Sequence, residues 1–192
     1  MQRLAAEGLL AGLLDLTTTE LADEVCGGVF SAGPERVRIG ASSAIPVVLA
    51  PGCVDMCNFG PRESVPPKYS SRLLYEWNAN VTLMRTSVEE NRRIGGLIAE
   101  TANRCAGPAV VLLPLRGVSM LDSEGGPFWD AEADRVCFDA IRSGLNQGIS
   151  LIEVDSNIND TIFADRATQV FLELSGRLGV TASEAAGSRA LS

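Results

Sequence analysis

The sequence contains no histidine. Without imidazole, this chain cannot build a Ser-His-Asp or Cys-His catalytic device by itself, because both devices use histidine as the near-neutral base. Acid–base chemistry would have to rely on carboxylates, on Lys68, on a thiol or on a bound metal. A zinc site is not expected either, because such sites usually combine histidine with paired cysteines.

Long apolar runs and basic stripes are also missing. No run approaches the roughly 20 residues of a membrane span, and the start of the chain lacks the pattern of a secretory signal. The formal net charge of −8 argues against nucleic-acid binding. The odd number of cysteines, five, is typical of reduced packing residues in a cytosolic protein. We therefore expect a cytoplasmic protein with neither nucleic acid nor membrane as a partner.

The composition is that of a globular protein. Hydrophobic residues make up 46% of the 192 residues and charged residues 21%, which is enough for one domain with a proper core. We predict a single domain over residues 1–180 and a flexible tail over 181–192.

Apolar segments alternate with segments of helical periodicity. The expected strands are residues 9–16, 46–50, 80–84, 109–113 and 150–154, and the expected helices are 18–25, 34–42, 87–105, 131–143 and 161–178. Such alternation predicts an α/β fold: a three-layer, Rossmann-like domain with a mostly parallel sheet of about five strands and helices on both faces. Residues 51–72 form a connection long enough to be functional or mobile.

The carboxyl ends of parallel strands meet at one edge of a sheet, so polar residues that follow the strands should converge. The predicted ligand-binding residues at this edge are Asp15, Thr17, Thr18, Gly52, Asn58, Arg85, Thr86, Arg116, Gly117, Gly125, Gly126, Asp155 and Asn159. The candidate catalytic residues are Ser119, Asp122, Asp55 and Glu20. Two arginines among carboxylates and hydroxyls suit an anionic or polyhydroxyl ligand.

Several of these residues also have a purely structural interpretation. Thr17 and Glu20 fit a capping box, as do Ser87 and Glu90. The Gly125–Gly126 pair suits either a phosphate-binding loop or a plain turn. Ser119 suits capping or hydrogen bonding as well as nucleophilic attack, since no GxSxG motif surrounds it.

Three aspartates leave a further question open. Asp15, Asp55 and Asp155 suit either Mg²⁺ binding or the capping of helices and backbone amides.

Five long segments together resemble one family. They are LDLTTTELADEVCGGVFSAGPER, PGCVDMCNFGPRESVP, NVTLMRTSVEENRRIG, LLPLRGVSMLDSEGGPFWD and IEVDSNINDTIFAD, in this order up to about Leu178. They are similar to the C-terminal half of the Tm-one-like ATP-binding family, a two-domain group of bacteria and of a plant antiviral resistance protein. The resemblance implies a Rossmann-like unit with a nucleotide-binding association, and a preceding half that this sequence does not contain.

Three functions are compatible with these observations. The first is a domain that binds a phosphorylated or nucleotide-like small molecule, with ATP or another phosphate-bearing ligand, and Mg²⁺, as the cofactors to consider. The second is a hydrolase of small esters that uses Ser119 or a loop cysteine, Cys53 or Cys57, as the nucleophile. The third is an interaction module that forms a homo-oligomer or pairs with the missing N-terminal half.

Overall fold

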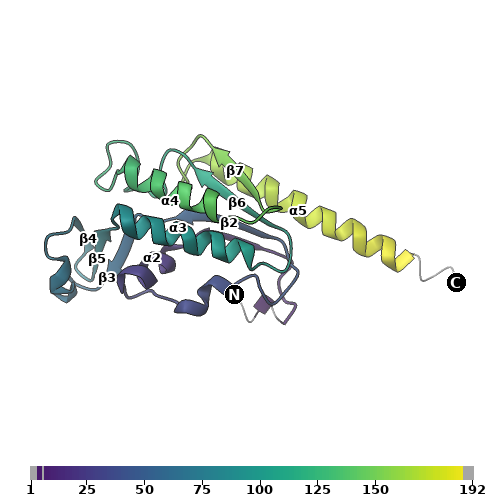
Figure 1. Cartoon of the computed structure of the whole chain (residues 1–192), viewed down its shortest axis with the longest axis horizontal. Coiled ribbons are helices and arrows are strands. Elements are labelled where there is room, and N and C mark those ends of the chain that lie inside the picture. The colour runs from purple at the N-terminus through teal and green to yellow at the C-terminus, as the bar shows by residue number, and fades with distance from the viewer. Residues whose placement is uncertain (1–3, 6, 188–192) are drawn as a thin grey trace.

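The computed structural model describes residues 4–5 and 7–187, with side chains through residue 176. Its main sheet has four parallel strands in the order β1-β2-β6-β7 (Figure 1). These strands are β1 (Leu13–Thr17), β2 (Val47–Gly52), β6 (Ala109–Pro114) and β7 (Ser150–Val154). β2 and β6 are buried along their whole length, as expected for central strands covered on both faces.

The helices divide unequally between the two faces of this sheet. The strand order advances in one direction, so right-handed crossovers place all connecting helices on one face. That face carries α2 (Thr19–Cys26), α3 (Val88–Asn103) and α4 (Ala131–Gly144), which share one hydrophobic core with the sheet. The other face is covered by α5 (Thr161–Gly187), through Phe163, Ala167 and Val170.

A second, smaller sheet corrects the expected five-stranded arrangement. Residues 80–84 do form a strand, β5 (Val81–Arg85), but it lies outside the parallel sheet. It pairs antiparallel with β3 (Met56–Phe59) and β4 (Leu74–Asn78), in the order β3-β5-β4. The connection over 51–72 is therefore ordered, with β3 and the 3₁₀ helices η2 (Arg62–Ser64) and η3 (Pro67–Tyr69).

Helix boundaries test the local predictions. The capping box of Ser87 and Glu90 is confirmed, with both reciprocal hydrogen bonds present. The prediction of a capping box at Thr17 and Glu20 is wrong, because the N-cap of α2 is Thr18. The Thr18 side chain does not cap the helix, since its hydroxyl donates to the Ala50 carbonyl. Residues 34–42 contain a short 3₁₀ helix, η1 (Pro34–Arg38), and α5 continues beyond the expected end at Gly179.

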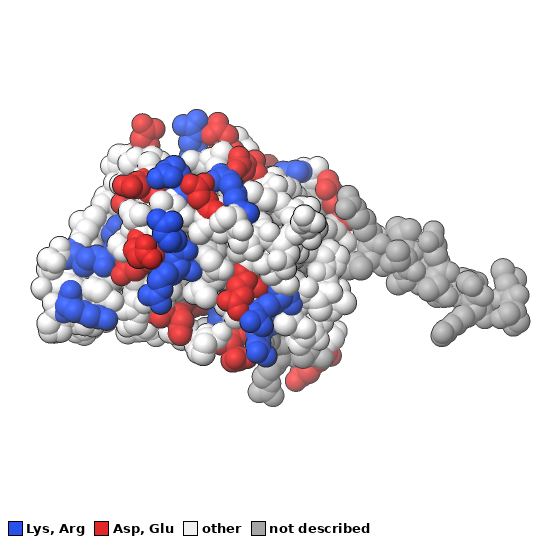
Figure 2. Space-filling view, in the orientation of Figure 1, with Lys and Arg blue, Asp and Glu red and all other residues white. Residues whose placement is uncertain are grey.

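Charged residues of both signs are interspersed on the face shown in Figure 2, where no stripe of one sign is visible. None of the helices in the described part of the chain combines the length and apolar composition needed to cross a bilayer.

Candidate functional site

A cavity of about 440 Å³ lies where the second sheet meets the loops after β2, β6 and β7. We call it the strand-end pocket. It is lined by Cys53, Met56, Asn58, Trp77, Asn78, Val81, Leu83, Ser119, Met120, Leu121 and Asn159. Three of these residues, Asn58, Ser119 and Asn159, belong to the site predicted from the sequence, so the predicted convergence at the strand ends is found for part of the set.

The amide side chains of the pocket are held by neighbouring groups. Asn58 Nδ2 donates to Thr19 Oγ1 at 3.0 Å and to Asp23 Oδ1 at 3.2 Å, while the backbone N–H of Asn58 donates to the same Asp23 oxygen at 2.7 Å. Asn159 donates its backbone N–H and its Nδ2 to Asn157 Oδ1. Side chains fixed in this way present hydrogen-bonding groups in a defined orientation, which favours selective binding.

Cys53 lines the pocket in an unusual backbone conformation. Its φ of 58° is left-handed, which is uncommon for a residue other than glycine and often marks a functional position. Burial, together with the nearby Asp55 carboxylate, raises the pKa of the Cys53 thiol to about 11. At neutral pH the thiol is therefore protonated and is a poor nucleophile.

The Ser119 hydroxyl is fully engaged in hydrogen bonds. It donates to Asp55 Oδ2 at 2.8 Å and accepts from the backbone N–H groups of Leu121 and Asp122 at 3.0 and 3.1 Å. Both lone pairs of the oxygen are thus directed at amides. This geometry stabilises the turn after β6.

Arg85 forms the centre of a buried charge cluster beneath the pocket. Its Nε donates to the Phe128 carbonyl at 2.7 Å, and its Nη2 lies 3.4 Å from Asp122 and 3.2 Å from Asp134. The Asp55 carboxyl, bonded to Ser119, adds a third acid whose Oδ1 is buried without a hydrogen-bond partner. Arg85 was expected to contact a ligand. Its guanidinium instead bonds to groups of the protein, and Arg85 is not part of the pocket lining.

Two acids of this cluster, Asp55 and Asp134, have raised pKa values. Burial, followed by repulsion from Asp122, raises the pKa of Asp55 to about 7 and that of Asp134 to about 8. One guanidinium cannot neutralise three buried carboxylates, so protons supply the remaining compensation near neutral pH.

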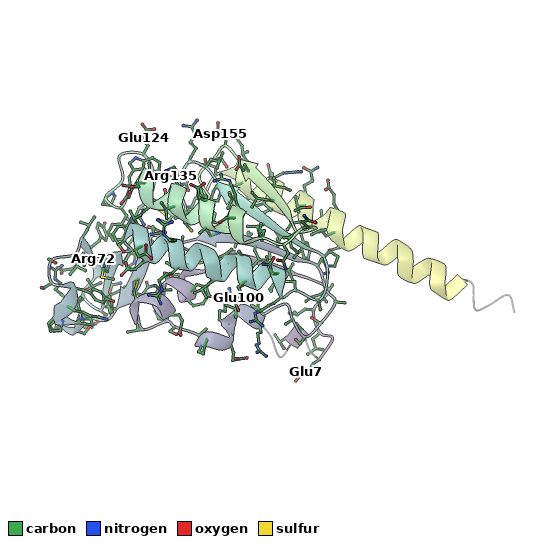
Figure 3. All side chains as sticks on the ribbon, viewed as in Figure 1. Glu7, Arg72, Glu100, Glu124, Arg135 and Asp155 are labelled. Carbon is green, nitrogen blue, oxygen red and sulfur yellow. The ribbon has the colours of Figure 1, made fainter. Side chains whose placement is uncertain are left out.

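Two other predicted groups form separate ion pairs away from the pocket. Asp15 accepts two bonds from Arg36 Nη2, at 2.7 and 2.8 Å, and Arg36 Nε also donates to Glu20. Arg116 pairs with Asp155 at the surface, where Figure 3 shows Asp155 projecting outward near Glu124.

The remaining predicted residues support the loops. Thr86 accepts a bond from Asn91 and donates to the Val54 carbonyl, and Thr17 pairs with Gly52 between β1 and β2. Gly125 adopts a positive φ, and a side chain at Gly126 would collide with the Leu121 carbonyl, so the turn that they form requires glycine at both positions.

The predicted acids therefore do not form a shared cation site. Asp15, Asp55 and Asp155 have different partners, and among the described residues no three Cys, Asp or Glu side chains are placed to hold one metal ion. A triphosphate likewise finds neither predicted arginine in the pocket lining. The residues present do not fit Mg-ATP in this pocket.

Gly117 is required by the loop that carries Ser119. Its φ is +121°, and an added Cβ would lie 1.8 Å from the Asp122 carbonyl oxygen. We expect Gly117→Ala to lower the free energy of unfolding by about 1 to 3 kcal/mol from backbone strain alone. Urea denaturation followed by circular dichroism measures this. Gly96→Ala in α3, where the Cβ meets nothing within 4 Å, is the control and should raise stability by about 0.5 to 1 kcal/mol. Equal losses of unfolding free energy in the two variants would show that the backbone of Gly117 is not strained by a side chain.

Several important residues were not predicted. Arg36, Asp23 and Asp134 bridge elements distant in sequence, and no local pattern marks them. From the sequence, residues 73–77 are expected as a short extended piece, which β4 bears out, and Trp77 is expected to pack in a loop or, less favoured, to stack on a ligand. Met56 lies in the connection over 51–72, where the sequence predicts no strand.

Comparison with known proteins places the chain in a family. Residues 1–175 match the model described as the C-terminal domain of the uncharacterised protein family UPF0261. A UPF0261 protein of Clostridium tetani is 46% identical over 165 residues, covering 85% of this chain and 41% of that protein.

Two further relatives extend the comparison. UPF0261 protein RA0729 of Rhizobium meliloti is 44% identical over 91% of this chain and 44% of its own length. The ToMV resistance protein Tm-1(GCR237) of tomato is 39% identical over 91% of this chain and 24% of its own length. The chain thus spans less than half the length of these relatives, and it belongs to the UPF0261 family, whose C-terminal domain it represents.

Proposed function

We propose that this domain binds a small, flat and uncharged molecule, such as the nucleoside part of a nucleotide-like ligand, in the strand-end pocket. The observation that carries the proposal is the lining itself: three asparagine amides and one hydroxyl among apolar walls, with no charged side chain. Apolar walls with a few fixed polar groups are typical of small-molecule sites. Trp77 supplies an aromatic surface against which a ring can stack.

The position of the pocket supports the same function. Ligands of open α/β sheets bind outside the carboxyl ends of the strands, where the loops after β2, β6 and β7 meet here. We infer that the fold is of the Rossmann-like type, which helices on both faces of the parallel sheet support. A phosphorylated ligand would have to place its phosphates beyond the pocket lining.

We also propose a cytoplasmic location. All five cysteines are free, which is typical of a reducing compartment.

Tryptophan fluorescence tests ligand binding directly. Trp77 and Trp129 are the two tryptophans, so a Trp129→Phe background reports on the pocket. Adenosine and other nucleosides should change the Trp77 emission in a saturable way, and ATP should do so no more strongly than adenosine. Inorganic phosphate should have no effect. If no nucleoside changes either the emission or the thermal stability, the proposal fails.

A paired substitution tests the site. Asn159→Ala removes one pocket amide and should weaken nucleoside binding about tenfold, the equivalent of about 1.4 kcal/mol for one lost hydrogen bond. Thr168→Ala on α5 lies outside the pocket lining and should leave the affinity unchanged. Equal affinities of both variants would place the ligand elsewhere.

A further inference from the structure

Large apolar side chains stand exposed at the mouth of the strand-end pocket. Trp77 is 55% exposed and Met120 is 72% exposed, although both line the pocket. Tyr75, 37% exposed, extends the surface along β4, with its ring centroid 6.5 Å from that of Trp77. We call Tyr75, Trp77 and Met120 the mouth patch. It joins elements about 45 residues apart, so it is a continuous feature of the fold and not one isolated side chain.

The mouth patch has the composition of a protein interface. Aromatic residues and methionine are enriched at the centres of such interfaces, and charged residues are depleted there. The pocket beneath the patch contributes no charged side chain, whereas charged residues are frequent on the face shown in Figure 2. More than half of Trp77 and of Met120 is exposed to solvent, and exposed apolar patches of this kind mark interaction sites.

The geometry of β4 limits how a partner can dock. β4 is an edge strand, and its register with β5 shifts between Glu76 and Asn78. Such irregularities discourage the pairing of a further strand. Glu76, which alternates with Tyr75 and Trp77 along the strand, lies 3.8 Å from Arg62. A partner would therefore contact the side chains of the mouth patch rather than the open backbone edge.

We infer that the mouth patch is the docking surface for the domain that accompanies this one in the longer UPF0261 chains. The relatives from Clostridium tetani and Rhizobium meliloti carry more than half of their length outside the match, and the family model describes the matched part as a C-terminal domain. A second domain seated on Trp77 and Met120 would bury them and close the strand-end pocket. The inference concerns the ligand-free protein and does not depend on the proposed ligand.

Hydroxyl-radical footprinting with mass spectrometry tests this assignment. The isolated chain is compared with a chimera in which it replaces the matched region of the Clostridium tetani protein. Labelling of Trp77 and Met120 should fall at least fivefold in the chimera. Leu172 is the internal reference: it is 62% exposed on α5, which points away from the second sheet (Figure 1), and its labelling should not change.

A second experiment applies if the chimera does not fold. The part of the Clostridium tetani protein outside the match is then added to the isolated chain, and the same protection of Trp77 and Met120 is expected. Met120→Asp should abolish this protection at Trp77, whereas Leu172→Asp should not. Equal labelling of the mouth patch with and without the added domain overturns the inference. Protection that instead grows with the concentration of the isolated chain also overturns it, because a second copy would then be the occupant.

Discussion

Replacing Arg85 with methionine is expected to lower the free energy of unfolding by about 3 to 5 kcal/mol at neutral pH, the cost of leaving a buried ion cluster without its partner. Methionine keeps much of the apolar volume, so the loss reports on charge and hydrogen bonding. The guanidinium is buried between Asp122 and Asp134 and also bonds to the Phe128 carbonyl.

The pH dependence of this loss distinguishes electrostatics from packing. Without Arg85, Asp55 and Asp134 can avoid an uncompensated charge by taking up protons, so the destabilisation should be smaller at pH 5 than at pH 8. Urea unfolding at both pH values measures the difference. Arg116→Met is the matched control, since its pair with Asp155 is 63% and 69% exposed and is expected to contribute little. Equal losses in the two variants would show that the Arg85 cluster is not a stabilising centre.

The stability of the parent protein should fall as the pH rises from about 5 to about 8. The pKa of Asp55 is raised by burial from 3.8 to about 7, and that of Asp134 to about 8. In this window the folded state binds more protons than the unfolded state, so each increment of pH favours unfolding. Each unit of pKa shift corresponds to about 1.4 kcal/mol, and we expect a decrease of a few kcal/mol for Asp55 and Asp134 together.

Below about pH 5, Glu90 gives stability the opposite dependence on pH. The pKa of Glu90 is lowered to about 2, because its bonds with Arg72 and with the backbone of Ser87 outweigh its partial burial. Its contribution is present above pH 4.5 and is lost as the pH falls toward 2. Stability should therefore be greatest near pH 5.

Asp134→Asn tests the origin of the slope. The neutral amide removes one titrating acid, so the variant should gain stability over the parent at pH 8 and show a flatter dependence between pH 5 and 8. Asp165→Asn on the exposed side of α5 is the control and should leave the slope unchanged. Chemical denaturation across this range measures both. An unchanged slope in Asp134→Asn would mean that Asp134 is ionised throughout.

Local signals predicted local features of the fold. Ser87 and Glu90 are three residues apart, so their capping box depends on one helical turn and is present as expected. The apolar runs of β2 and β6 are buried strands because no polar side chain interrupts them. Thr17 and Glu20 show the same pattern as Ser87 and Glu90 without the box, because Glu20 binds Arg36 from a different element.

Sheet membership and charge pairing could not be predicted in this way. The segment around β5 has the alternation of a strand, but its partners β3 and β4 are chosen by packing between segments distant in the chain. Arg85 is the last residue of β5 and was expected to contact a ligand. Its actual partners, Asp122 and Asp134, lie 37 and 49 residues further along the chain.

The sequence by itself determined the α/β class, most element positions and a polar convergence at the strand ends, because periodicity, capping and strand direction depend on neighbouring residues. The tertiary structure alone decided which polar residues remain available to a ligand. Burial forces charges such as Arg85 and Asp15 to pair within the protein, and it leaves amides and exposed apolar side chains around the strand-end pocket.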